Sequence, residues 1–194
     1  MEEFEITFIV IDGLDASGKT TQAYRLTSFL QRQGKSFCLR IHPSTDNFFG
    51  SHARFFLQSN GKGAHFAAAL FYMFDVLYSI LLFIWRDYNY VIFVRYLLGT
   101  AYLPWPLDKI AYHFFALVVP KPNKLFFIDV KPEAAYERIK NRSDISFEMF
   151  EKPEALREIR SKGLELALIG KWLIIDGEKP EEDVELTIRG LLGL

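Results

Sequence analysis

Apolar runs of six to eight residues recur along the chain and alternate with stretches that have helical spacing. Most of these runs are rich in Ile, Val and Phe, which is typical of strands buried on both faces of a sheet. We expect five strands, at residues 4–11, 36–41, 90–96, 124–130 and 171–176. Strands and helices that alternate in this way favour the α/β class, with a five-stranded parallel sheet and helices on both faces.

The stretches between the strands carry the start and stop signals of helices. The helix after the first strand ends at Gly34, and Pro132 and Pro153 suit the first turn of two later helices, because proline lacks the N–H that this position leaves unpaired. The expected helices run from the loop after the first strand to about 33, then over 51–58, 64–87, 107–117, 132–141, 153–170 and 180–192. No linker or repeat interrupts the series, so we expect residues 1–194 to form a single domain.

One of these helices is apolar enough to be weighed as a membrane span. Residues 66–85 have the length of a span, but Asp75 lies at the centre, where an acid costs about 2.5–3.5 kcal/mol. Asp75, Ser79 and Arg86 also share one face of the helix. We interpret the segment as a buried helix with one polar stripe and expect no membrane contact.

Composition and charge argue against several classes of partner. Half of the 194 residues are hydrophobic and 24% are charged, as in an ordinary globular protein. The net charge is −1 and there is no long basic run, which argues against nucleic acid as a partner. The start of the chain is acidic and does not resemble a secretory signal, and the single cysteine, Cys38, cannot form an internal disulfide. We expect a cytoplasmic protein.

The sequence GLDASGKT, residues 13–20, satisfies the phosphate-loop pattern G-x-x-x-x-G-K-[ST]. Its glycines let the backbone fold closely around an anion, and the start of the next helix adds a positive dipole end. The Lys19 ammonium can reach the β and γ phosphates, and the Thr20 hydroxyl can bind Mg²⁺. Because the pattern lies between an expected strand and an expected helix, we predict binding of ATP or GTP. The predicted nucleotide-binding residues of the loop are Gly13, Asp15, Ala16, Ser17, Gly18, Lys19, Thr20 and Thr21.

A series of motifs along the chain resembles one enzyme family. The loop IDGLDASGKTTQ is similar to that of thymidylate kinases, and so are HPS after the second strand, GSHARFFLQ, ALFYMFD, VRY with GTAY, and VPKPNKLFFIDVKPEAAYERIKNR. Their order and spacing match the family from residue 4 to about 175. The resemblance implies a P-loop kinase fold, transfer of the γ-phosphate of Mg-ATP to dTMP or a related nucleoside monophosphate, and a homodimer. We expect the dimer contact on the apolar helix 64–87.

The resemblance also implies roles for particular side chains. Asp15 would meet the 3′-hydroxyl of the acceptor nucleotide or orient the loop. Arg95, at the end of the third strand, would bridge the acceptor phosphate and the transferring phosphoryl group. Arg54 would approach the acceptor phosphate, Phe71 would stack on the base, and Tyr102 would pack near the sugar. The alternatives are a solvated acid at Asp15, a surface ion pair at Arg95 and core packing at Tyr102.

Two positions depart from the family pattern. Val94 stands where the D-R-Y motif of the family has an Asp that helps to hold the metal, so this task would fall to Thr20, with Asp12 as a helper. Asp75 stands where the family has an Arg, four residues after the stacking Phe. Arginine donates hydrogen bonds, whereas ionised aspartate only accepts them. Two hypotheses stay open: either base choice is altered, or Asp75 pairs with a nearby arginine and is structural.

A short lid is expected around residues 138–150. Mobile lids in this class of kinase supply arginines to the γ-phosphate and exclude water as they close. Arg138 and Arg142 lie four residues apart and would share one helical face. Some thymidylate kinases have an arginine at the loop position of Ala16, so the resemblance implies that the lid supplies the catalytic arginine here. Arg142 is the first candidate, and Arg138 is expected to contact ATP.

Two further functions remain open on the sequence alone. Val94, Asp75 and Thr45 also fit a nucleotide-binding pseudokinase with a regulatory role. The phosphate loop by itself fits a kinase for a nucleoside or another small acceptor. The four histidines have no spacing that would suggest a metal site. An acceptor screen separates these functions, because a nucleoside kinase does not need an arginine that holds the acceptor phosphate.

Overall fold

The computed structural model describes residues 6–59, 62–141 and 152–194. A five-stranded sheet in the order β2-β3-β1-β4-β5 forms its centre, and every pair of neighbouring strands is parallel. The strands are β1 (Thr7–Gly13), β2 (Phe37–Ile41), β3 (Tyr90–Val94), β4 (Lys124–Asp129) and β5 (Leu173–Asp176). All five lie where the apolar runs predicted them, and the parallel arrangement is confirmed.

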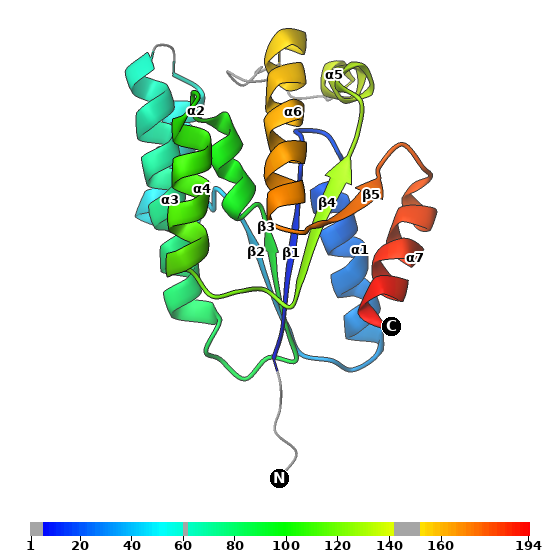
Figure 1. The fold of residues 1–194 in the computed structure, drawn as a ribbon. Helices are drawn as coiled ribbons and strands as arrows, with labels where there is room; N and C mark the ends of the chain where they lie inside the picture. The colour runs from blue at the N-terminus through cyan, green and yellow to red at the C-terminus, as the bar shows by residue number, and fades with distance from the viewer. Residues whose placement is uncertain (1–5, 60–61, 142–151) are drawn as a thin grey trace.

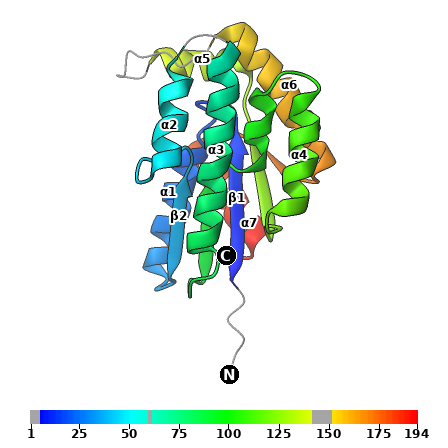
Figure 2. The same ribbon diagram turned by 90° about the vertical axis from the view of Figure 1, so that its left-hand side faces the viewer.

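Helices cover both faces of this sheet (Figures 1 and 2). On one face lie α1 (Lys19–Arg32) and α7 (Glu181–Leu192), which pack against each other. The other face is covered by α3 (Lys62–Phe83), α4 (Leu107–Val118) and α6 (Pro153–Ile169). The helix α2 (Phe48–Leu57) packs on α3, and α5 (Pro132–Lys140) packs on α6. The expected α/β fold with two helical layers is therefore confirmed.

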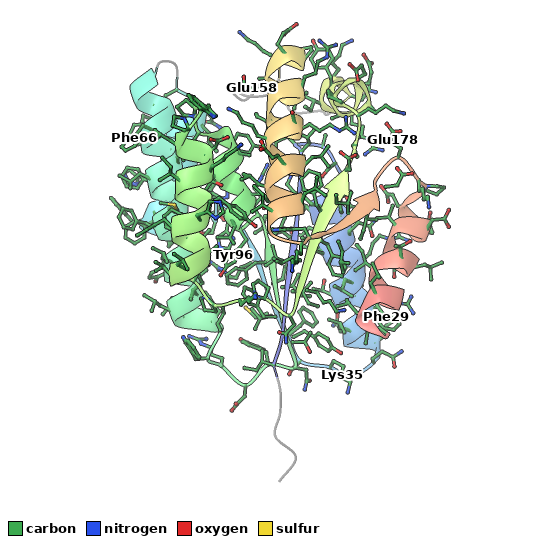
Figure 3. All side chains as sticks on the ribbon, viewed as in Figure 1. Phe29, Lys35, Phe66, Tyr96, Glu158 and Glu178 are labelled. Atoms are coloured by element: carbon green, nitrogen blue, oxygen red, sulfur yellow. The ribbon has the colours of Figure 1, made fainter. Side chains whose placement is uncertain are left out.

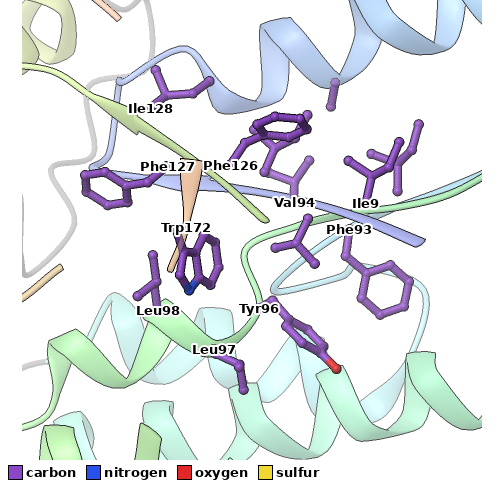
Figure 4. Packing of buried hydrophobic residues seen from close by; sticks show 14 of the residues in the cluster. Ile9, Phe93, Val94, Tyr96, Leu97, Leu98, Phe126, Phe127, Ile128 and Trp172 are labelled. Atoms are coloured by element: carbon purple, nitrogen blue, oxygen red, sulfur yellow. The ribbon is translucent and has the colours of Figure 1, made fainter. Parts of the chain in front are cut away.

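The core is built from the central strands, which have neighbours on both edges and helices on both faces. Ile9, Phe93 and Phe126 come from β1, β3 and β4 and are fully shielded from solvent (Figure 4). Burying a side chain of this size contributes about 1.5–3 kcal/mol. Because all strands are parallel, their carboxyl ends and the loops that follow them meet at one edge of the sheet. This stable core holds those loops in place.

Several element bounds differ from the sequence predictions, and three differences bear on the site or on the surface of the protein. A 3₁₀ helix, η1 (Leu97–Tyr102), follows β3 and was not predicted. The helix α2 begins earlier than expected, because the Asn47 side chain accepts a hydrogen bond from the Gly50 amide at 2.9 Å and caps its first turn. The helix α3 ends at Phe83, several residues before the expected end.

The orientation of α3 corrects the expectation of a buried apolar helix. Among the described residues, one helix is long and apolar enough to cross a membrane, over Phe66–Phe83, yet only 28% of this window is buried. Asp75 and Ser79 point inward and are fully buried, whereas Leu81 is 72% exposed. Arg86 lies beyond the helix end and is exposed, so it does not belong to the buried stripe. The polar stripe of α3 thus faces the protein interior, and much of its apolar surface faces outward.

Candidate active site

The loop between β1 and α1 has the backbone geometry that the phosphate-loop pattern requires. Gly13 and Gly18 have φ angles of 152° and 92°, in the region that side chains disfavour. A Cβ atom on Gly13 would also lie 2.5 Å from the Ile128 carbonyl oxygen, so β4 leaves no room for a side chain there. Lys19 is the first residue of α1, which places the start of this helix at the loop.

The Lys19 ammonium lies inside the loop. Its Nζ donates a hydrogen bond to the Leu14 carbonyl oxygen at 2.7 Å and lies 3.5 Å from Oδ1 of Asp15. The residue is only 4% exposed. Burial, helped by the positive charge of Arg95, lowers the pKa of Lys19 to about 8. A charged lysine at the start of the helix that follows the loop can bind the terminal phosphates of a nucleotide.

Asp15 connects three side chains of the candidate site. Its carboxylate pairs with the Arg95 guanidinium and accepts a hydrogen bond from the Tyr102 hydroxyl at 3.0 Å. Burial alone would raise the pKa of Asp15, but the charges of Arg95 and Lys19 outweigh it and hold that pKa well below its usual value. The structure therefore brings together Asp15 and Lys19 of the phosphate loop with Arg95 and Tyr102, which lie in later motifs of the sequence.

Arg95 follows directly after β3 and has a left-handed backbone with φ of 64°. Its amide donates a hydrogen bond to the Ile11 carbonyl oxygen at 3.0 Å, which continues the pairing of β3 with β1. Its Nη1 donates to the His42 carbonyl oxygen at 3.3 Å. A residue with a Cβ atom adopts this conformation at a cost, which is typical of functional sites.

Asp12 is buried near the end of β1, next to the first glycine of the loop. One of its oxygens accepts a hydrogen bond from the Gly13 amide at 2.9 Å, and the other accepts one from the Tyr96 amide at 3.0 Å. Burial raises the pKa of Asp12. Within the described ranges, no three His, Cys, Asp or Glu side chains gather into a possible metal site. Thr20 lines the loop cavity, and its role as a metal ligand stays a prediction.

A cavity of about 520 Å³ opens above the loop. Arg138 lies at its edge, where Nη1 donates to the Ala16 carbonyl oxygen at 3.2 Å and Nη2 to the Gly177 carbonyl oxygen at 3.0 Å. Gly177 and Lys179 from the connection between β5 and α7, and Glu181 from the start of α7, also line the cavity and were not predicted from the sequence. The rule that ligands collect at the carboxyl ends of parallel strands could have found them. Arg142 and most of the expected lid lie outside the described residues.

Two expected acceptor contacts lie on the helices that follow β2. Phe71, on α3, stacks with the ring of Phe56 at 5.6 Å and with the ring of His52 at 5.2 Å between ring centroids. Arg54 is exposed on α2. Both residues belong to the same pair of packed helices, but their contact with an acceptor stays a prediction.

Asp75 is fully buried and accepts three hydrogen bonds. They come from the Ser44 amide at 2.6 Å, the Ser44 hydroxyl at 2.5 Å and the Asn47 side-chain amide at 2.7 Å. The nearby Arg40 pairs with Asp46 instead. This geometry favours the structural hypothesis for Asp75, although the partners are a serine and an asparagine and not the arginine that was expected.

The comparison with known proteins identifies the family of the chain. Residues 11–188 match the family model for thymidylate kinase. The chain belongs to the thymidylate kinase family. It is 30% identical to a probable thymidylate kinase of Metallosphaera sedula, over 91% of this chain and 87% of that protein. It is 28% identical to a probable thymidylate kinase of Sulfurisphaera tokodaii, over 96% of each chain.

A solved thymidylate kinase structure from Candida albicans has the same fold. The two structures superpose with a TM-score of 0.74 at 20% sequence identity, over 96% of this chain and 91% of that one. At this identity the likeness concerns the fold alone. The assignment to the thymidylate kinase family rests on the family model and on the sequence relatives, and it confirms the resemblance seen in the motifs.

Proposed function

We propose that this protein transfers the γ-phosphoryl group of ATP to dTMP or a related nucleoside monophosphate. The observation that carries the proposal is the position of Arg95. Its guanidinium contacts Asp15 of the phosphate loop, and both residues line the same cavity as Lys19. A second cation beside the phosphate loop suits an acceptor that itself carries a phosphate.

The donor phosphates would lie along the backbone amides of the loop and the Lys19 ammonium. The cavity is large enough for a triphosphate and opens at the start of α1. Magnesium would be held by the Thr20 hydroxyl together with phosphate oxygens, and it would neutralise charge on the phosphates when bound. Asp12 already accepts two backbone hydrogen bonds and would orient the loop from behind.

In the transfer step, an oxygen of the acceptor phosphate forms a bond to the γ phosphorus, while the bond from this phosphorus to the β–γ bridging oxygen breaks. The products are ADP and a nucleoside diphosphate. The attacking oxygen is largely ionised at neutral pH, so no strong base is needed. Arg95 would align the two phosphates and offset their charge, and Arg138 and Arg142 would approach the donor side.

The acceptor nucleoside would extend from Arg95 toward α2 and α3. We assign Tyr102 and Asp15 to the sugar, Phe71 to the base and Arg54 to the phosphate. The hydrogen bonds of Asp75 to Ser44 and Asn47 support a structural role for this residue, which would leave base choice to other side chains.

A panel of acceptors tests the proposal. The protein is incubated with ATP and Mg²⁺ and with dTMP, dUMP, dCMP, dGMP or dAMP in turn, and ADP release is measured against a sample without acceptor. We expect release that depends on a monophosphate, with dTMP among the best. Tight ATP binding without such release would instead indicate a regulatory pseudokinase, and release with nucleosides would indicate a nucleoside kinase.

We further propose that the protein is a cytoplasmic homodimer that covers the apolar surface of α3 and α4. Phe66 lies on the outer side of α3 and is 60% exposed (Figure 3). Other exposed apolar residues on these helices include Leu70, Phe74, Leu81, Leu82, Ile110, Phe114 and Leu117. A surface of this kind is more typical of an interface than of a monomer.

Sedimentation analysis tests the dimer. Leu81→Glu should convert the protein to a monomer, because it places a charge on the proposed contact. The matched control is Leu186→Glu, at an exposed leucine of α7 on the opposite face of the sheet, and it should leave the dimer intact. A wild-type protein that sediments as a monomer at micromolar concentration would contradict this proposal.

A further inference from the structure

A chain of buried hydrogen bonds lies beneath Arg95. Nε of Arg40 lies 3.2 Å from the Ser79 hydroxyl, this hydroxyl lies 2.9 Å from Nε2 of His42, and Nδ1 of His42 lies 3.1 Å from the carbonyl oxygen of Arg95. His42 and Ser79 are fully shielded from solvent. The chain therefore joins the buried stripe of α3 to the backbone of the arginine that we place at the phosphates.

Chemistry fixes the direction of every bond in this chain. The Arg95 carbonyl oxygen can only accept, so Nδ1 of His42 carries the proton. Burial lowers the pKa of His42 to about 4, so the ring is neutral near pH 7 and Nε2 is an acceptor. The Ser79 hydroxyl then donates to Nε2, and its oxygen accepts from the Arg40 guanidinium. Each polar group in the chain thus has a partner of the opposite kind.

The backbone of His42 is held on both sides. Its amide donates to the Val94 carbonyl oxygen at 3.0 Å, and its own carbonyl oxygen accepts from Nη1 of Arg95 at 3.3 Å. The turn that follows is held by Asp75, which accepts from the amide and the hydroxyl of Ser44. The imidazole of His42 therefore has little freedom to move, and its hydrogen bond holds the carbonyl oxygen of Arg95 in place.

That contact matters because Arg95 has a left-handed backbone, which a residue with a Cβ atom does not adopt without support. The amide of Arg95 donates a hydrogen bond to the Ile11 carbonyl oxygen, and the carbonyl oxygen of Arg95 accepts one from the His42 ring. These two bonds hold the two ends of the residue. The orientation of its peptide units decides where the guanidinium points.

We propose that His42 is a positioning residue of the phosphoryl-transfer site, which acts through its Nδ1–H bond to the Arg95 carbonyl oxygen. The inference rests on the proposed function, since it deepens the role of Arg95. His42 does not touch the nucleotides. It aims the guanidinium at the space between Asp15 and the phosphate loop, and Ser79 orients the imidazole ring.

Two variants of His42 separate this role from simple packing. The amide of asparagine can place an N–H near the position of Nδ1, whereas the amide of glutamine reaches the position of Nε2. His42→Asn therefore retains the bond to Arg95, and His42→Gln retains only the bond to Ser79. We expect His42→Gln to lower kcat by about 10- to 100-fold with little change in the KM for ATP, the loss that a misplaced catalytic group produces.

His42→Asn should recover most of this kcat, even if it melts at a similar temperature to His42→Gln. The control is His113→Gln, at an exposed histidine of α4, which should change neither kcat nor melting temperature. Equal losses of kcat in the two His42 variants would overturn the inference, because packing and not the Nδ1–H bond would then be responsible.

A double-mutant cycle with Arg95→Ala tests whether His42 acts through Arg95. If it does, His42→Gln lowers kcat in the wild-type background and causes no further loss when Arg95 is already alanine. Multiplied losses in the double variant would contradict the proposal. Ser79→Ala removes the hydrogen bond to Nε2 of His42 and leaves Nδ1 unchanged, so it should lower kcat less than His42→Gln does. It replaces His42→Gln in the test if that variant does not fold.

One measurement keeps this inference distinct from the proposed function. Nitrogen NMR of His42 in the ligand-free protein should show a protonated Nδ1 and an unprotonated Nε2, and the guanidinium signals of Arg95 should change in His42→Gln but not in His42→Asn. If no acceptor is phosphorylated but the His42 and Arg95 signals show this pattern, the proposed function fails while the positioning of Arg95 by His42 holds. Arg95 signals that are unchanged in His42→Gln would overturn the inference.

Discussion

Arg95 and Asp15 form an ion pair that connects the end of β3 to the phosphate loop, across 80 positions of sequence. Both side chains also contact other members of the site, since Asp15 accepts from Tyr102 and lies near Lys19. The pair holds the guanidinium at the loop before any nucleotide binds. An arriving phosphate thus meets an arginine that is already oriented, which lowers the cost of ordering it.

The first prediction concerns this guanidinium. Arg95→Lys retains a positive charge but loses the planar pair of donors that can contact two phosphates at once. We expect kcat to fall by about 10²–10³-fold with a smaller change in the KM for ATP, as measured by steady-state ADP release. The control is Arg157→Lys, at an exposed arginine that pairs with Glu133 between α6 and α5. An unchanged kcat in Arg95→Lys would remove this residue from the transfer step.

The second prediction concerns pH. The pKa of Lys19 is lowered to about 8, so its ammonium is charged below that pH and becomes neutral above it. The charged form binds phosphate, so kcat/KM for ATP should be highest between about pH 7 and pH 8 and should fall as pH rises further. Phosphate groups ionise near pH 6, so the nucleotide does not cause this decrease. A kcat/KM that stays level to pH 10 would show that the free enzyme does not depend on this proton.

The third prediction concerns Asp75. In Asp75→Asn an N–H group replaces an oxygen that accepts from Ser44 or Asn47, so two donors face each other. The free energy of unfolding should fall by about 1–3 kcal/mol in urea titrations, while the order of preference among monophosphates stays the same. Asp87→Asn, at an exposed aspartate after α3, is the control. Unchanged stability together with a new base preference would place Asp75 at the base.

The fourth prediction concerns stability in acid. Burial lowers the pKa of His42 from 6.5 to about 4. The negative charge of Asp75 opposes this shift, and the positive charge of Arg40 adds to it. The unfolded chain therefore takes up a proton at a higher pH than the folded protein does. This contribution to stability is complete above pH 6.5 and is lost as pH falls toward 4, by up to about 3 kcal/mol. Unfolding curves of wild type and His42→Asn should show the loss in the wild type alone, and parallel curves would contradict it.

Much of the fold could be read from the sequence because the strands and the phosphate loop are encoded locally. The strand β3 consists of apolar and aromatic residues. The loop with Lys19 has the G-x-x-x-x-G-K-[ST] pattern, which is specific for phosphate-binding loops. The meeting of Arg95 with this loop also followed, since the ends of parallel strands lie at one edge of the sheet. Sequence signals of this kind depend on neighbours in the chain or on a general rule of topology.

The direction in which α3 faces could not be read in the same way. Its apolar residues lie nearly all round the helix, so periodicity showed that Asp75 and Ser79 share a face but not that this face points inward. What decides the orientation is a set of distant partners, namely His42 and Ser44 in the loop after β2. The loop around Gly177 was missed because its role depends on contacts with Arg138 and the phosphate loop.

The most direct test of the account is transfer of labelled phosphate from [γ-³²P]ATP to dTMP by wild-type protein and by Lys19→Ala, with Mg²⁺ present. We predict that the wild type forms labelled dTDP and that the variant loses at least about 10²-fold in rate, because the buried ammonium no longer faces the phosphates. The account would be contradicted if the wild type labelled none of the nucleoside monophosphates, or if Lys19→Ala transferred phosphate as fast as the wild type.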